Sequence, residues 1–386
     1  MKRFGLVIAG GGLTAARTIK ACRSRLHQLS ALGQSVWIDY LSRDLIESGA
    51  LARAVDEDAV VGVTSNPSIF QKALSDGHAY DEQIGTGTED NAESVFLSLA
   101  LRDVAAACDL LRPVWEQTEA HDGYVSIEVE PTLAADTEAT IAQATRFHEA
   151  IARPNLLVKI PATDAGVPAI EEMTARGYSI NVTLIFSLRR HVQVAKAYLR
   201  GLERLVAAGG DPSRVHSVAS FFVSRVDTET DRRLAAAGRD DLKGRLGIAN
   251  AKLAYQQYQE LFAGKHWEAL AARGATTQRC LWASTSTKDP SLRDTLYVDE
   301  LIGPETISTM PAETIEAFQD HGHVEVRLES ALEEARYLFN QLYVVGVDYD
   351  EVVATLEREG IDKFVASYNE LLQGIAEKRQ QLASAA

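Results

Sequence analysis

The chain has 386 residues, 46% of them hydrophobic, and a formal net charge of −15. This length allows one large domain or two ordinary ones with a full core, and the acidic balance disfavours general attraction to nucleic acid phosphates or anionic membranes. The three cysteines, Cys22, Cys108 and Cys280, lie too far apart in sequence to predict a disulfide framework or a zinc site, and no apolar run is long enough to span a membrane. We therefore predict a cytoplasmic protein with no nucleic acid or membrane partner.

The first predicted element is a strand, a glycine turn and a helix between Phe4 and Arg17. Its Gly10-Gly11-Gly12 turn matches the G-x-G-x-x-A form of a dinucleotide-binding fingerprint. Asp39 ends the next apolar strand, but it lies beyond the usual spacing of about 20 residues, and nothing later completes a second mononucleotide-binding half. We interpret residues 1–30 as a non-native or loosely attached leader, or as a helix across one end of the fold. A nucleotide- or flavin-binding oxidoreductase is the disfavoured alternative.

Eight short apolar, β-branched segments follow and alternate with helical stretches. The predicted strands are residues 35–39, 60–65, 124–128, 156–160, 179–186, 215–223, 278–283 and 305–309. The predicted helices between them include residues 90–116, 137–152, 188–207 and 248–272. Continuous apolar strands suit a parallel sheet that is covered on both faces, and eight repeats favour a closed (β/α)8 barrel, the TIM barrel of the α/β class.

About 70 residues beyond the last strand have a largely helical pattern. Predicted helices at 328–344, 350–359 and 361–382 are separated by Gly346 and Gly360. No linker rich in Gly, Ser or Pro precedes them. We therefore predict a single barrel domain over residues 31–386, with additional C-terminal helices at about 320–386 packed on the barrel.

A lysine inside the most hydrophobic stretch is the strongest single indication of function. Lys159 lies between Leu156 and Pro161 in a predicted strand. An ammonium group among apolar neighbours loses hydration, which favours a neutral amine that can attack a carbonyl. The alternative is an edge-strand lysine whose stem packs while its charged end reaches water.

Polar side chains gather at the predicted carboxyl ends of the strands, where barrels of this kind place their reacting groups. The candidates are Asp39, Asn66, Glu128, Lys159, Asn181, Thr183, Ser220, Phe222 and Arg225. Taken singly, they also have structural interpretations: a helix cap for Asp39, a turn for Asn66, ion pairs for Glu128 and Arg225, backbone hydrogen bonds for Asn181 and Thr183, and core packing for Phe222. Independent structural causes would scatter polar residues over both ends of the barrel, so their joint placement favours one site.

The same segments, in order, resemble the transaldolase family. The motifs are Trp-Ile-Asp at 37–39, Thr-Ser-Asn-Pro-Ser at 64–68, Ile-Glu-Val at 127–129, Val-Lys-Ile-Pro-Ala-Thr at 158–163, Asn-Val-Thr-Leu-Ile-Phe-Ser at 181–187 and Phe-Phe-Val-Ser-Arg-Val-Asp at 221–227. The resemblance runs from about Val36 to the C-terminus, and the chain length is similar to that of the longer actinobacterial or cyanobacterial type.

The resemblance implies transfer of a dihydroxyacetone unit in the non-oxidative pentose phosphate pathway, without a metal or organic cofactor. The donor would be sedoheptulose 7-phosphate or fructose 6-phosphate, and the acceptor glyceraldehyde 3-phosphate or erythrose 4-phosphate. By the same resemblance, Lys159 forms the Schiff base, Asp39 takes the C4 hydroxyl proton, and Glu128 with Thr183 moves protons through a water molecule.

The resemblance also implies the residues that bind substrate. Hydroxyls of the three-carbon unit would contact Asn66, Asn181 and Ser220, Phe222 would exclude water, and Arg225 would anchor phosphate.

The sequence departs from the family pattern after the seventh strand. Better-known transaldolases carry Ala-Ser-x-Arg there, whereas Ser286 occupies the arginine position in this chain and Lys288 follows it. We predict that Ser286 and Lys288 contact the phosphate instead. A fructose 6-phosphate aldolase-like lyase stays an alternative, and a monomer or homodimer is expected.

Overall fold

The structure is a computed structural model that describes residues 24–75 and 77–385. The Gly10-Gly11-Gly12 turn and Cys22 lie outside the described residues. Within the predicted leader, described residues form the helix α2 (Arg25–Ala31), whose N-cap is Ser24. This helix packs against the first strand and against α15 (Ala312–His321).

Eight parallel strands close into a barrel in sequence order. They are β1 (Gln34–Ile38), β2 (Val60–Val63), β3 (Tyr124–Glu128), β4 (Leu156–Pro161), β5 (Ile180–Ile185), β6 (Ser217–Phe222), β7 (Gln278–Ala283) and β8 (Thr306–Met310). Every strand lies within two residues of its predicted bounds, and β3 and β7 have the predicted bounds themselves. The predicted (β/α)8 barrel is therefore confirmed.

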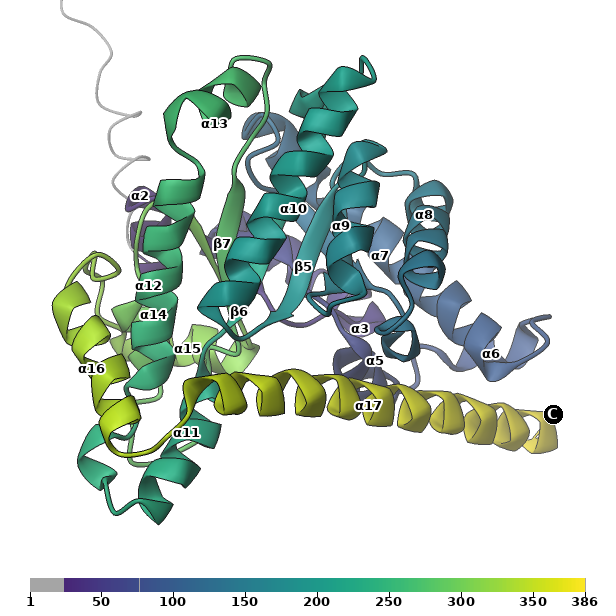
Figure 1. Cartoon of the computed structure of the whole chain (residues 1–386). Helices are drawn as coiled ribbons and strands as arrows, with labels where there is room; N and C mark the ends of the chain where they lie inside the picture. Colours follow the sequence, from purple (N-terminus) through teal and green to yellow (C-terminus); the bar gives the residue numbers. More distant parts are fainter. Residues whose placement is uncertain (1–23, 76, 386) are drawn as a thin grey trace, which may run out of the picture.

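Helices surround the barrel on its outside (Figure 1). In chain order they are α3 (Arg43–Glu47), α4 (Ala50–Asp58), α5 (Pro67–Ser75), α6 (Asp81–Thr86), α7 (Ala92–Gln117), α8 (Thr137–Ile151), α9 (Gly166–Ala175), α10 (Leu188–Ala207), α11 (Ser224–Ala236), α12 (Leu246–Leu261), α13 (Gly264–Ala271), α14 (Leu296–Glu300) and α15. Side chains cap the N-termini of several of these helices. Asp136 accepts a hydrogen bond from the backbone N–H of Ala139, and Ser187 accepts one from the backbone N–H of Arg190.

The predicted helix at 248–272 is wrong as a single element, because the chain turns between α12 and α13. The rings of Tyr258, Phe262 and Trp267 pack on one another across this turn, with centroids 5.4 Å apart for Tyr258–Phe262 and 5.0 Å for Phe262–Trp267. Tertiary packing of aromatic side chains outweighs the local helical pattern here.

The C-terminal region also departs from prediction at Gly360. Two helices follow the barrel, α16 (Leu332–Val344) and α17 (Tyr349–Ala385), and α17 runs through Gly360 without a break. A Cβ at this position would lie 3.2 Å from Leu184 Cδ2 and 3.4 Å from Phe186 Cε2. Glycine therefore serves close packing of α17 on the end of β5 rather than helix termination.

In Figure 1, α17 extends along the lower edge of the molecule, from α11 at one end to α6 at the other. It packs against α5, α6, α7, α11 and β5. The helix thus covers the face of the barrel on which the strands have their carboxyl ends.

A glycine opposite a tryptophan sets the pairing of the first two strands. Trp37 is fully buried and pairs in register with Gly62, where a Cβ would lie 2.4 Å from the indole ring. The glycine leaves room for the ring in the barrel interior. Because Ile38 then pairs with Val63, the next residues, Asp39 and Thr64, become neighbours at the strand ends.

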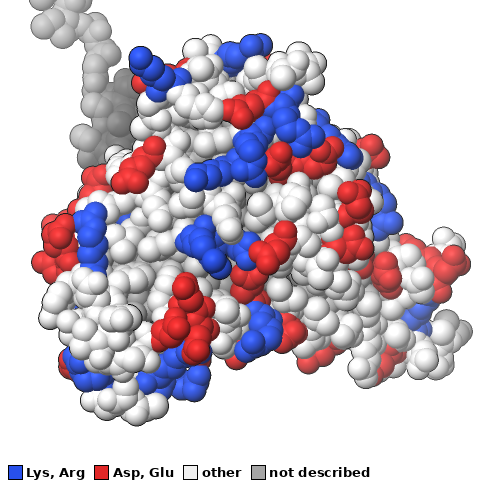
Figure 2. Space-filling view, viewed as in Figure 1, with Lys and Arg blue, Asp and Glu red and all other residues white. Residues whose placement is uncertain are grey.

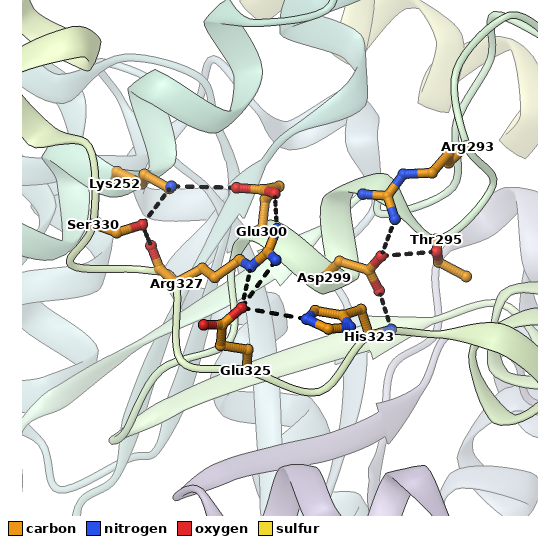
Figure 3. Close-up of polar contacts among 9 residues, drawn as sticks. All are labelled: Lys252, Arg293, Thr295, Asp299, Glu300, His323, Glu325, Arg327 and Ser330. Carbon is orange, nitrogen blue, oxygen red and sulfur yellow. Dashed lines mark hydrogen bonds and ion pairs between the residues drawn. The ribbon is translucent and has the colours of Figure 1, made fainter.

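A polar cluster joins α14 to the segment that leads into α16 (Figure 3). We call it the crossover network, and it consists of Lys252, Arg293, Thr295, Asp299, Glu300, His323, Glu325, Arg327 and Ser330. Arg327 Nη1 donates to Glu300 Oε1 at 2.7 Å, and Arg293 Nη1 to Asp299 Oδ2 at 2.9 Å. Each cation in the network has a carboxylate partner. We therefore interpret the crossover network as a set of structural contacts that holds these segments together, and not as a reactive site.

Charges are mixed on the face shown in Figure 2, where basic and acidic side chains lie next to one another. On α9 and α10, Arg200 pairs with Glu171 and Arg204 with Glu172, each at 2.6 Å. Within residues 24–75 and 77–385, none of the helices has the length and apolar character needed to cross a membrane.

Candidate active site

A cavity of about 180 Å³ lies at the carboxyl ends of the strands, beneath α17. Its lining includes every predicted site residue except Glu128 and Asn181, namely Asp39, Asn66, Lys159, Thr183, Ser220, Phe222, Arg225, Ser286 and Lys288. Glu128 and Asn181 lie immediately behind the wall, since both pair in register with Lys159 across the neighbouring strands. The structure thus brings all the predicted site residues together.

Lys159 is buried at the centre of this site. Its side chain extends from β4, which is paired with β3 on one side and β5 on the other, and the residue is 4% exposed. The Nζ atom donates to the backbone oxygen of Ser65 at 3.1 Å and lies 3.5 Å from Glu128 Oε2. These features contradict the alternative of an edge-strand lysine that reaches water.

Glu128 and Thr183 place buried polar atoms beside this amine. Burial raises the pKa of Glu128, and the charge of Lys159 partly opposes that rise. Neither carboxylate oxygen of Glu128 nor the hydroxyl of Thr183 has a hydrogen-bond partner among the described residues. A carboxyl group with a raised pKa next to an amine is suited to give and take protons during carbonyl chemistry.

The backbone of β5 is irregular at Thr183. The register with β6 shifts between Val182 and Ile185, and Leu184 has a φ of +57°. That region is rarely adopted by residues other than glycine, and such strain concentrates at functional sites. The irregularity lies where Thr183 turns toward the cavity.

Asp39 follows the end of β1 and is held by a chain of hydroxyl groups. Thr64 Oγ1 donates to Asp39 Oδ1 at 2.6 Å, and Thr309 Oγ1 lies 2.7 Å from Thr64 Oγ1. Because Thr64 uses its proton for Asp39, Thr309 is the donor in the second contact. The N-cap of α3 is Ser42, so the helix-cap interpretation of Asp39 is wrong.

Three further polar residues are organised by hydrogen bonds to their neighbours. Asn66 Oδ1 accepts from the backbone N–H of Ile69 at 3.0 Å and so caps α5, which leaves its amide nitrogen for the cavity. Asn181 is fully buried and accepts from Ser220 Oγ at 2.7 Å. Asn181 therefore orients Ser220, which is the one that lines the cavity.

The guanidinium group of Arg225 lies between two aromatic rings. Its Cζ is 5.0 Å from the centroid of Phe222 and 5.8 Å from that of Phe364. Burial lowers the pKa of Arg225, while Asp39 and Glu128 oppose that change. Arg225 has no ion-pair partner within the described part of the chain, so the surface ion pair considered from sequence is not what holds it.

Several cavity residues were not predicted from the sequence. They are Thr64, Ala283, Thr309, Pro311, Lys363 and Phe364. Thr64 belongs to a motif that the sequence singles out, whereas Lys363 and Phe364 come from α17, whose position over the barrel has no local signature except Gly360. Ser284, at the end of β7, has a φ of +56°, and the chain beyond it brings Ser286 and Lys288 to the cavity wall.

A buried carboxyl group supports the helix that carries Arg225. Asp227 accepts hydrogen bonds from the backbone N–H of Gly247 at 2.6 Å and from the hydroxyl of Tyr297 at 2.8 Å. Burial raises the pKa of Asp227 to about 7. The pKa of aspartate in an unfolded chain is about 3.9. At pH values between about 3.9 and about 7, the folded protein therefore binds one proton more than the unfolded chain does.

We predict that Asp227→Asn changes how stability depends on pH. Ionising Asp227 costs the wild type about 4 kcal/mol of its free energy of unfolding as pH rises from about 4 to 8, and an amide escapes this cost. Urea unfolding of both proteins at pH 5 and pH 8 should therefore show the variant gaining stability relative to the wild type at the higher pH. A difference that is the same at both pH values would contradict the buried-acid assignment.

The described residues contain no group of three or more His, Cys, Asp or Glu side chains that is arranged to hold a metal ion. The polar groups in and beside the cavity are the amine of Lys159, the carboxyl groups of Asp39 and Glu128, several hydroxyls, and the cations Arg225, Lys288 and Lys363.

Comparison with known proteins points to one family. The family described as Transaldolase/Fructose-6-phosphate aldolase matches residues 36–375. The chain is 50% identical over 367 residues to a transaldolase of Mycolicibacterium paratuberculosis, covering 93% of this chain and 98% of that protein. It is also 50% identical over 376 residues to a transaldolase of Mycobacterium leprae, with coverage of 96% and 100%, and 50% identical over 373 residues to transaldolase 1 of Streptomyces avermitilis, with coverage of 94% and 97%. The resemblance inferred from the motifs is confirmed.

Proposed function

Since the chain belongs to the transaldolase and fructose-6-phosphate aldolase family, we propose that this cavity transfers a dihydroxyacetone unit from a ketose phosphate to an aldose phosphate through a Schiff base on Lys159. Sedoheptulose 7-phosphate or fructose 6-phosphate is the donor, and glyceraldehyde 3-phosphate or erythrose 4-phosphate is the acceptor. The reaction belongs to the non-oxidative pentose phosphate pathway. The observation that carries the proposal is the burial of Lys159 Nζ, 3.5 Å from Glu128, at the carboxyl ends of the strands.

The first step joins the amine to the sugar. The neutral amine of Lys159 attacks C2 of the ketose, and one proton moves from the nitrogen to the carbonyl oxygen, which becomes the hydroxyl of a carbinolamine. That hydroxyl then leaves as water, with a second proton, to give the iminium ion. Glu128 and Thr183 move these protons through a water molecule held between them, a role supported by the raised pKa of Glu128 and by their buried oxygen atoms, which accept or donate no hydrogen bond among the described residues.

The second step breaks the bond between C3 and C4. Asp39 removes the proton of the C4 hydroxyl, an aldehyde forms at C4, and the bonding electrons move to C3 and into the iminium group. Thr64 holds one oxygen of Asp39 and leaves the other for the sugar. After the aldose phosphate departs, an acceptor aldehyde enters and the same steps run in reverse, ending with hydrolysis from Lys159.

The remaining residues hold the substrate. Asn66 and Ser220 bind the hydroxyls of the three-carbon unit, with Asn181 orienting Ser220. Phe222 shields the carbanion from water and also packs against Arg225. Arg225 binds the phosphate through its planar fork, with Ser286 and Lys288 from the loop after β7.

A lyase that releases free dihydroxyacetone is the second candidate, because the matching family includes both activities. The transferase is favoured by the relatives that are 50% identical, which are transaldolases, and by Glu128 at the proton-shuttle position.

We expect fructose 6-phosphate and erythrose 4-phosphate to yield sedoheptulose 7-phosphate and glyceraldehyde 3-phosphate much faster than fructose 6-phosphate alone yields dihydroxyacetone. Water exclusion by Phe222 protects the bound three-carbon unit from protonation and release. A coupled assay run with and without the acceptor measures both rates. Equal rates would favour the lyase.

The cytoplasmic location also belongs to this proposal. It is supported by the two described cysteines, Cys108 and Cys280, which are buried free thiols. We further propose residues 31–386 as one domain, and a monomer or homodimer stays a prediction.

A further inference from the structure

We propose that Lys363, on the C-terminal helix α17, is a third cation of the phosphate site and supplies the charge that is missing at Ser286. This inference rests on the proposed function, because it assigns a residue to the substrate phosphate. It identifies α17 as part of the binding site and not only as a cover for the barrel.

The backbone of α17 is fixed over the cavity at two points. Gly360 packs closely on Leu184 and Phe186 at the end of β5. Ser367 accepts a hydrogen bond from Ser68, in the first turn of α5, at 2.7 Å. Lys363 lies between these two points and lines the cavity together with Phe364. Its position over the site is therefore set by packing on both sides.

Phe364 links this helix directly to the predicted phosphate anchor. Its side chain is buried, and the guanidinium carbon of Arg225 lies 5.8 Å from its ring centroid. The residue next to it in sequence, Lys363, is exposed and lines the cavity. One turn of α17 thus contributes a wall for Arg225 and a further positive charge.

Three of the cations that line the cavity have no carboxylate partner among the described residues. None of the described carboxylates forms an ion pair with Arg225, Lys288 or Lys363, and Lys288 donates only to Ser286, at 2.6 Å. The charge of Arg225 lowers the pKa of Lys363, and partial burial and Lys288 lower it further. Like charges that face one another are costly unless an anion binds among them.

A phosphate dianion is the ligand that this arrangement fits. Asp39 is the acidic residue on the cavity wall, and its Oδ1 is already bonded to Thr64. An arginine after β7 would bind phosphate through a rigid fork, whereas two lysines act as compact charges on flexible stems. Lys288, from the loop after β7, and Lys363, from α17, together replace that fork.

Lys363→Met tests the inference, with Lys363→Arg as the charge-preserving variant and Arg358→Ala as the matched control. Arg358 is an exposed cation on the same helix that does not line the cavity. We expect Lys363→Met to raise the KM for fructose 6-phosphate, and the inhibition constant of inorganic phosphate, by about tenfold. Lys363→Arg should recover most of the loss, and Arg358→Ala should match the wild type.

Borohydride trapping of free dihydroxyacetone separates phosphate binding from imine chemistry, because this ketone has no phosphate. Adduct formation on Lys159 should fall far less in Lys363→Met than binding of fructose 6-phosphate does. Equal losses for both compounds, unchanged constants in Lys363→Met, or the same loss in Arg358→Ala would each overturn the assignment of Lys363. Failure of the wild type itself to form the adduct would instead refute the proposed Schiff base.

Discussion

Replacing Lys159 with methionine is expected to lower kcat by roughly 10⁴-fold or more, because it removes the buried amine beside Glu128 that is proposed to form the Schiff base. Methionine fills a similar volume, so the barrel should still fold. Reduction with borohydride in the presence of fructose 6-phosphate, followed by peptide mass analysis, should find a three-carbon adduct on the Lys159 peptide of the wild type and none in the variant.

Lys252→Met is the matched control for this experiment. Lys252 is also 4% exposed, but it belongs to the crossover network and lies 3.4 Å from Glu300, away from the cavity. Its loss should reduce stability and leave the adduct on Lys159 intact. An adduct on a different lysine, or substantial turnover by Lys159→Met, would show that the nucleophile is assigned to the wrong residue.

Asp39→Asn is expected to lower kcat by roughly 10²–10⁴-fold while leaving the imine free to form. The amide can keep the hydrogen bond from Thr64, but it cannot accept the C4 hydroxyl proton, so the bond between C3 and C4 stays intact. Borohydride should then trap the whole six-carbon sugar phosphate on Lys159 instead of the three-carbon unit. Mass analysis distinguishes the two adducts directly.

The control for Asp39→Asn is Asp44→Asn, which changes an exposed carboxylate on α3 outside the cavity. This variant should cleave the sugar normally and give the three-carbon adduct. If Asp39→Asn also gives mainly the three-carbon adduct, another group acts as the base for cleavage.

The barrel could be predicted from sequence because each strand is a short apolar run with its own boundaries. In the interior of a parallel barrel both faces of a strand are covered, so the local pattern and the final environment agree. For this reason β3 and β7 begin and end at the predicted residues. From the predicted strand ends alone, Lys159, Glu128 and Asp39 could be expected to lie near one another.

The parts that could not be predicted depend on contacts between distant segments. Gly360 has the local pattern of a helix end, yet its small size serves packing against Leu184 and Phe186. Lys363 is an ordinary exposed helical lysine until α17 is placed over the cavity. Likewise, the separate roles of Asn181 and Ser220 depend on one hydrogen bond between them. Ser220 lines the cavity, and Asn181 orients it from behind.

Synthesis order gives α17 a further consequence. The helix follows all eight strands in the chain, so the ribosome synthesises Lys159, Glu128 and Asp39 before Lys363 and Phe364. During that interval the mouth is uncovered and Arg225 lacks one of its two aromatic neighbours. Because α17 provides both a cover and part of the wall, the cavity is complete only after this helix has been synthesised and has packed on the barrel.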